Sequence, residues 1–150
     1  MLDAPPRAVV YLEPGPPVSS DPMTLDADLK DLATGKNFAA LTTLMADGQP
    51  QTQIMWVHAD DEHVLINTEV HRRKFKNVEA DPRVTVCVIN AENPYQYVEA
   101  RGRVVNTVGG DEARAQIDEL AHKYIDGPYG NPITSAVSYT HLTLPTICSV

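Results

Sequence analysis

The spacing of hydrophobic residues predicts one helix followed by a series of short strands. Leu25, Leu29 and Leu32 are four and three positions apart, which places them on one face of a helix, and Gly35 suits its C-terminal end. Alternating or continuous apolar residues then predict five strands, over 38–45, 51–58, 64–68, 84–89 and 97–105. The Asp47-Gly48 pair between the first two is a strong hairpin signal.

Two more helices are predicted farther along the chain. Residues 71–80 have Phe75 and Val78 three positions apart, and Asp81-Pro82 should end this short helix. After Gly109-Gly110, an apolar stripe at helical spacing comprises Ala113, Ile117, Leu120, Ala121 and Tyr124. Short connections between the early strands imply antiparallel pairing, and five strands in so short a chain favour a closed or nearly closed barrel. The predicted class is therefore mainly β with helices (α+β).

The two ends of the chain differ from this central part. Residues 1–22 carry six prolines and few core-forming residues, which predicts an extended, poorly ordered leader, with Met23 as an alternative start. The segment VSYTHLTLPT, residues 137–146, back-translates to codons that resemble a transposase adapter used in preparing sequencing libraries. We therefore expect one domain over 23–136 and a sequencing artefact over 137–150. The alternative is a last β-strand, with which Ser138, Thr140, Leu142 and Leu144 are compatible.

Composition and charge exclude several classes of protein. The chain has 150 residues, of which 43% are hydrophobic and 21% are charged, as in a soluble globular domain. No apolar stretch approaches the roughly 18 residues that a membrane span needs, and no secretory signal is recognisable. A net charge of −8 argues against nucleic-acid binding. Cys87 lies in a run of β-branched residues, so we expect its thiol to be buried. With so few cysteines we expect no disulfide framework, and a cytoplasmic protein.

The densest chemical signal is the segment NTEVHRRK, residues 67–74. Five of the 12 basic residues fall within twelve positions, and they are Arg72, Arg73, Lys74, Lys76 and Arg83. A phosphate needs convergent N–H donors and positive charge, and a helix start adds its own donors and dipole. The forked guanidinium of Arg72 suits two phosphate oxygens, and Lys74 adds a point charge. From spacing alone, a solvated helix face that balances an acidic protein is the simpler interpretation.

The residues around this segment resemble a known superfamily. NTEVHRRKFKNVEADPRVTVCV (67–88) is similar to the cofactor-binding segment of the flavin-binding split β-barrel superfamily, which includes pyridoxamine 5′-phosphate oxidases. More narrowly, it resembles the branch that uses the deazaflavin coenzyme F420. FAALTTLMADGQPQTQIMWV, NPYQYVEARGRVV and AQIDELAHKYIDGPYG agree, in order, over 25–130. The resemblance implies an antiparallel split β-barrel of the FMN-binding type, in a homodimer whose cofactor lies between a barrel edge and the partner subunit.

The resemblance also implies roles for individual residues. Arg72 and Lys74 would hold the cofactor phosphate, and Asn67 and Thr68 would line the ring and the ribityl chain. Three residues of the neighbouring strand would pass under the ring, namely Gln51, Gln53 and Met55. Asn77 matches a recurrent asparagine that supports the loop. Glu69-Val70-His71 departs from the more basic or glycine-containing turn of many relatives.

Other residues receive simpler interpretations. Trp56 lies on the strand face opposite Gln53 and Met55 and is predicted to pack in the core, with a subunit interface as the alternative. The histidines lack helical pairs or cysteine partners, so we expect no metal site and surface positions for His58, His63 and His71. Tyr95 and Tyr97 could reach the site across a dimer interface or cover an apolar surface.

Together these features predict an oxidoreductase that transfers a hydride between coenzyme F420 and a small conjugated substrate. The cofactor carries the hydride chemistry, so no catalytic side chain is assigned. The alternatives are an FMN-binding oxidase or reductase of the pyridoxamine 5′-phosphate oxidase-like class, and a non-enzymatic cofactor- or haem-binding protein. The predicted partners are a small-molecule substrate and a second copy of the chain, with no nucleic acid and no membrane.

Overall fold

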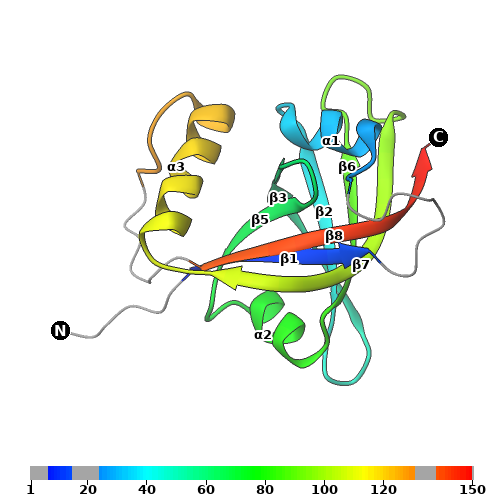
Figure 1. Ribbon diagram of the computed structural model, residues 1–150, viewed down its shortest axis with the longest axis vertical. Helices are drawn as coiled ribbons and strands as arrows, with labels where there is room; N and C mark the ends of the chain where they lie inside the picture. The colour runs from blue at the N-terminus through cyan, green and yellow to red at the C-terminus, as the bar shows by residue number, and fades with distance from the viewer. Residues whose placement is uncertain (1–6, 15–23, 131–137, 150) are drawn as a thin grey trace.

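The computed structural model of the protein describes residues 7–14, 24–130 and 138–149, the first and last of these as backbone only. Within these residues, the chain forms eight strands and three helices (Figure 1). Their order is β1 (Arg7–Pro14), α1 (Ala27–Thr34), β2 (Phe38–Leu44), β3 (Pro50–Trp56), β4 (His58–Ala59), β5 (Val64–Glu69), α2 (Arg73–Ala80), β6 (Arg83–Ile89), β7 (Tyr97–Val108), α3 (Asp111–Ile125) and β8 (Ser138–Ser149).

The strands form one antiparallel sheet that curls almost into a barrel. Its strand order is β3-β2-β6-β7-β1-β8-β5-β4, so β3 and β4 are the two edges. Only Val57 separates β3 from β4 along the chain, and β4 pairs with β5 through no more than His58 and Ala59. One bent strand therefore supplies both edges, and the described strands β3 and β5 do not pair with each other. The predicted α+β class and antiparallel barrel-like sheet are confirmed.

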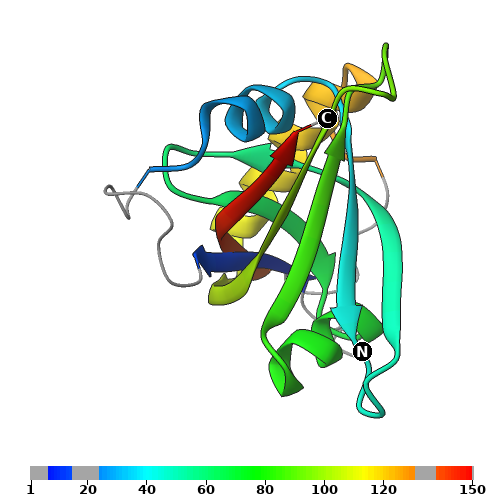
Figure 2. The ribbon, with the colours of Figure 1, turned by 90° about the vertical axis from the view of Figure 1, so that its right-hand side faces the viewer.

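The core fills the inside of the curled sheet, and two helices cover its ends. On β2 the inward positions Ala39, Leu41 and Thr43 are buried, alternating with more exposed residues as a sheet with one covered face requires. Helix α1 buries Leu29 and helix α2 buries Phe75 in the same core. The two helices lie at opposite ends of the barrel (Figures 1 and 2). Among α1, α2 and α3, none combines the length and apolar character needed to traverse a bilayer.

Helix α3 lies beside the barrel and is tied to the bend between β3 and β4 (Figure 1). The Tyr124 hydroxyl accepts from the Val57 N–H at 3.1 Å and donates to the Asn37 carbonyl. Lys123 Nζ donates to the carbonyls of Val57 at 2.6 Å and Ala33 at 2.9 Å. Because a bend interrupts strand pairing, these side chains satisfy backbone groups that the sheet leaves unpaired. The apolar stripe predicted for this helix is confirmed, since all of its residues are buried.

The structure corrects two sequence predictions and agrees with the alternative given for a third segment. Residues 7–14, predicted as part of a poorly ordered leader, form β1, because their run of β-branched and apolar residues suits a strand and Pro14 falls at its end. The remainder of 1–22, and Met23, lie outside the described residues. The single strand predicted over 51–58 is divided at Val57. Residues 138–149 form β8, which pairs with β5 and β7, as in the alternative interpretation of this segment as a last strand. The sequencing origin of 137–150 stays a prediction.

Replacing Tyr124 with phenylalanine should destabilise the fold. The hydroxyl is the hydrogen-bond partner of the Val57 N–H and the Asn37 carbonyl, so its removal leaves buried backbone groups unpaired. We expect Tyr124→Phe to lower the free energy of unfolding by about 1–3 kcal/mol in urea titrations. Tyr95→Phe is the matched control, because Tyr95 is 86% exposed and its change should be nearly neutral. Equal stability of the two variants would contradict the role assigned to Tyr124.

Candidate binding pocket

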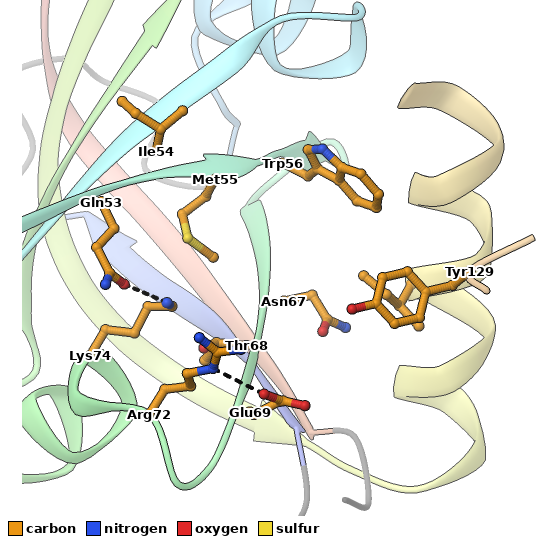
Figure 3. Close-up of a pocket in the computed structure, with 11 residues that line it drawn as sticks. Gln53, Ile54, Met55, Trp56, Asn67, Thr68, Glu69, Arg72, Lys74 and Tyr129 are labelled. Atoms are coloured by element: carbon orange, nitrogen blue, oxygen red, sulfur yellow. Dashed lines mark hydrogen bonds and ion pairs between the residues drawn. The ribbon is translucent and has the colours of Figure 1, made fainter. Parts of the chain in front are cut away.

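A pocket of about 560 Å³ lies where β3 and β5 diverge, between the start of α2 and the face of α3 (Figure 3). Its size falls in the range of small-molecule and cofactor sites. One end carries charged and polar side chains, and the other is apolar and aromatic. The lining residues are Gln53, Ile54, Met55, Trp56, Asn67, Thr68, Glu69, Arg72, Lys74, Ile117 and Tyr129.

The charged end of the pocket is built at the start of α2. Arg72 is the N-cap residue and makes no side-chain cap bond, so the helix presents its N-terminal backbone and dipole at this end. The Arg72 side chain is 54% exposed, and its Nε donates to Glu69 Oε2 at 2.9 Å. Lys74 is only 7% exposed, and its Nζ donates to Gln53 Oε1 (Figure 3). Two cations therefore converge on a partly enclosed space.

Helix α2 is held in place by its apolar face and by one asparagine. Phe75 and Val78 pack in the barrel core. Asn77 is buried, and its Nδ2 donates to Thr43 Oγ1 at 3.0 Å and to Gln51 Oε1 at 3.1 Å. Asn77 thus joins the helix to the β2–β3 hairpin, as predicted for a supporting residue. Gln51 was predicted to bind cofactor, but the structure does not place it in the pocket, because its amide oxygen accepts from Asn77 instead.

The end of β5 contributes buried polar side chains. Asn67 and Thr68 are 8% and 5% exposed, and Asn67 Nδ2 donates to the Ala113 carbonyl at 3.4 Å. Within the described part of the chain, Asn67 Oδ1 and Thr68 Oγ1 have no hydrogen-bond partner. Buried oxygens of this kind are rarely left unpaired, because their desolvation is not compensated. Their position in the lining fits a ligand that offers hydrogen-bond donors.

The apolar end of the pocket is aromatic. Trp56 stacks on Tyr124 with ring centroids 5.2 Å apart and an interplanar angle of 4°, and Tyr129 meets Trp56 edge-on at 6.2 Å. Trp56 was predicted to pack in the core. It packs against the second apolar core cluster, formed by Ile117, Leu120 and Tyr124 of α3, because β3 is an edge strand beside that helix. The side chain points toward α3 in Figure 3.

Six of the seven predicted site residues line this pocket, and five lining residues were not predicted. The six are Gln53, Met55, Asn67, Thr68, Arg72 and Lys74. The five are Ile54, Trp56, Glu69, Ile117 and Tyr129. The apolar stripe of α3 already included Ile117, but the sequence did not indicate which element the stripe covers. Glu69 stands within the cationic segment and could have been found from its position alone.

The three histidines discussed above, and Tyr95 and Tyr97, lie outside the pocket. His58 is half-buried beside Glu119 and Lys123, so it is less exposed than the surface position predicted for it. His63 Nδ1 lies 3.2 Å from Asp60 Oδ1, and His71 is exposed. No three potential metal-ligating side chains gather within the described ranges. Tyr95 is exposed, and Tyr97 is half-buried on the outer face of the sheet.

Comparisons with known proteins agree with this geometry. The model of a family described as "Pyridoxamine 5′-phosphate oxidase" matches residues 25–142. A solved structure named "F420 Reductase" is 29% identical, with a TM-score of 0.70, and the match covers 83% of this chain and 98% of that chain. No curated protein matches.

Two less similar structures show the same fold. A putative pyridoxamine 5′-phosphate oxidase from Listeria innocua is 19% identical, with a TM-score of 0.58, and the match covers 75% of this chain and 87% of that chain. HutZ, a haem storage protein from Vibrio cholerae, is 17% identical, with a TM-score of 0.60, over 85% of this chain and 95% of that chain. The split β-barrel implied by the sequence is therefore confirmed.

Acidification should destabilise the protein through His58. Burial is the main cause that lowers the pKa of His58 below its ordinary value of 6.5, and the charge of Lys123 adds to it. The unfolded chain therefore binds a proton here at higher pH than the folded chain, and stability is lost as the pH falls from above 6.5 through the lowered pKa.

Urea unfolding at two pH values, one on each side of this transition, tests the effect. The loss of unfolding free energy between the higher and the lower pH should be smaller in His58→Gln than in the wild type. The same loss in both proteins would show that His58 does not carry the effect.

Proposed function

Because the chain belongs to the pyridoxamine 5′-phosphate oxidase family, we propose that it is an oxidoreductase that binds the deazaflavin coenzyme F420 and transfers a hydride between it and a small conjugated substrate. The observation that supports this most strongly is the pocket itself. It combines two convergent cations, an aromatic wall and two buried oxygens for which the described residues supply no partner. The 29% identical structure named "F420 Reductase" favours the deazaflavin over other flavins.

Arg72 and Lys74 are the residues that would hold the cofactor phosphate. Charge-assisted hydrogen bonds from a guanidinium and an ammonium are stronger than neutral ones. The start of α2 at Arg73 adds the positive end of a helix dipole beside both side chains. Lys74 is buried, so its charge is weakly screened by water and acts strongly on a nearby anion. This combination suits a phosphate at the end of a flexible chain.

Asn67, Thr68, Gln53 and Met55 would contact the rest of the cofactor. Asn67 Oδ1 and Thr68 Oγ1, which have no partner in the described part of the chain, can accept hydrogen bonds from ribityl hydroxyls or from an N–H at the polar edge of the ring. Gln53 and Met55 line the pocket from β3, and Met55 gives a polarisable surface for the ring. These side chains therefore fit a ligand with a flat ring at one end and a polar chain that leads to a phosphate at the other.

The apolar end of the pocket would receive the substrate. When bound, the deazaflavin supplies the atom that donates or accepts the hydride. Trp56, Ile117 and Tyr129 form a wall that excludes water and can hold a flat conjugated molecule. Hydride transfer requires the reacting atoms to be held a few ångströms apart, so the role of these residues is orientation.

FMN is the second candidate, because its phosphate also ends a ribityl chain. Arg72 and Lys74 would bind either phosphate, and the family match includes oxidases of pyridoxamine 5′-phosphate. A carrier of flavin, deazaflavin or haem is the non-enzymatic alternative. The similarity to a haem storage protein supports only a common fold, at 17% identity.

We also propose that the protein acts as a cytoplasmic homodimer. The outer face of the sheet is apolar where β2, β3 and β6 adjoin, with Ala40 paired to Ile54 on one side and to Cys87 on the other. Ile54 is 64% exposed on this face and Phe38 beside it is also exposed. A second copy of the chain would cover these side chains next to the pocket. Cys87 is a free thiol, which suits a reducing compartment.

Titration of the purified full chain with F420 and with FMN tests the proposed cofactor. Binding of the deazaflavin in preference to FMN, followed by reduction of a dye or quinone when reduced deazaflavin is supplied, is the expected result. Tighter binding of FMN than of F420 would show that the assignment of F420 as the cofactor is wrong. Tight binding without turnover on any acceptor would favour a carrier.

Removing both phosphate-binding cations should weaken cofactor binding. Each charge-assisted bond lost costs about 1.5–3 kcal/mol, so Arg72→Ala with Lys74→Ala should raise the dissociation constant about a hundredfold or more. The matched control is Arg73→Ala with Lys76→Ala, which removes the same charge from exposed positions of the same helix. If both double variants raised the dissociation constant equally, general electrostatic attraction would explain the effect, and Arg72 and Lys74 would not be specific phosphate ligands.

A further inference from the structure

A buried carboxylate lies within the proposed phosphate site. Glu69 is 8% exposed, lines the pocket and accepts from Arg72 Nε at 2.9 Å (Figure 3). His71 Nε2 lies 3.4 Å from the same oxygen, but the histidine is outside the lining. Among the described lining residues, Arg72 and Lys74 are positive and Glu69 is negative, so their formal charges add to +1. A buried carboxylate lowers the positive charge of the pocket, so attraction of phosphate alone does not explain its position here.

Arg72 can hold Glu69 and a ligand at the same time. A guanidinium has five N–H groups in a planar fork, and only Nε is directed to Glu69. Within the part of the chain that the structure describes, the outer nitrogens Nη1 and Nη2 make no hydrogen bond, and the side chain is 54% exposed. A phosphate can therefore bind these outer nitrogens and Lys74 while Glu69 stays in place. Glu69 is then a permanent negative neighbour of the phosphate.

The effect of such a neighbour depends on the charge of the phosphate. A phosphate monoester carries about −1.5 to −2 at neutral pH, whereas a diester carries a single charge. The repulsion from Glu69 is proportional to that charge and is large in a partly buried site. Coenzyme F420 presents a diester at this position, and FMN presents a monoester.

We propose that Glu69 is a specificity-determining residue that tunes the pocket to a singly charged phosphodiester and disfavours a phosphate monoester. The inference rests on the proposed function, since it concerns how the same pocket chooses between the two phosphates. Glu69 does not take part in the hydride transfer. It acts by setting the charge that the ligand must carry.

The test compares Glu69→Gln with the wild-type full chain for three ligands that share the deazaflavin ring. The ligands are the unphosphorylated riboside, its 5′-phosphate monoester and coenzyme F420. For each ligand, the dissociation constant for the variant is compared with that for the wild type, so the contributions of the ligand's other groups cancel. Because repulsion scales with charge, the monoester should bind at least about tenfold more tightly to Glu69→Gln, and F420 about threefold. Binding of the riboside should not change.

Two further variants complete the experiment. Glu79→Gln makes the same chemical change at an exposed position of α2 and should alter none of the three affinities. Glu69→Met tests a second uncharged side chain and should also favour the monoester most. Equal changes for all ligands, or weaker binding of both phosphorylated ligands to the Glu69 variants, would overturn the role of Glu69. Failure of the wild type and all variants to bind any of the three would instead overturn the proposed function.

Discussion

Burial of charge where β5 gives way to α2 is the constraint on which the rest of the account depends. Lys74 and Glu69 are almost fully buried within six positions of each other, and Asn67 and Thr68 precede them. Each of these groups loses water on folding, and the loss must be offset by partners or by a ligand. Gln53 and Arg72 supply partners for the two charged groups, yet two of the oxygens have no partner among the described residues. A fold selected for stability alone would place apolar side chains at these positions.

The split in the barrel makes room for this chemistry. Because β3 and β4 are two parts of one strand that bends at Val57, the sheet cannot close between β3 and β5, and the pocket lies in that gap. Tyr124 and Lys123 fix α3 to the bend through backbone groups of Val57. The same helix carries Ile117, and its Tyr124 supports Trp56. The aromatic wall therefore depends on the same junction that interrupts the sheet.

Much of the fold and of the charged part of the site could be predicted from local patterns. The Asp47-Gly48 turn, the apolar face of α1 and the stripe of α3 follow from spacing over a few residues, and Arg72 and Lys74 follow from a cluster within one segment. The bend at Val57 could not be predicted, because the apolar pattern continues across it and only contacts with α3 divide the strand. Trp56 and Tyr129 meet across long sequence separation, so their contact depends on tertiary structure. Gln51 lies on the same strand face as Gln53 and Met55, but its amide oxygen accepts a hydrogen bond from Asn77.

The most direct measurement of the central claim is a crystal structure of the full chain with coenzyme F420. The account predicts the phosphate within hydrogen-bonding distance of the Arg72 guanidinium and Lys74 Nζ, with the ring beside Met55. A bound cofactor whose phosphate contacts neither side chain, with Arg72 directed into solvent, would contradict it.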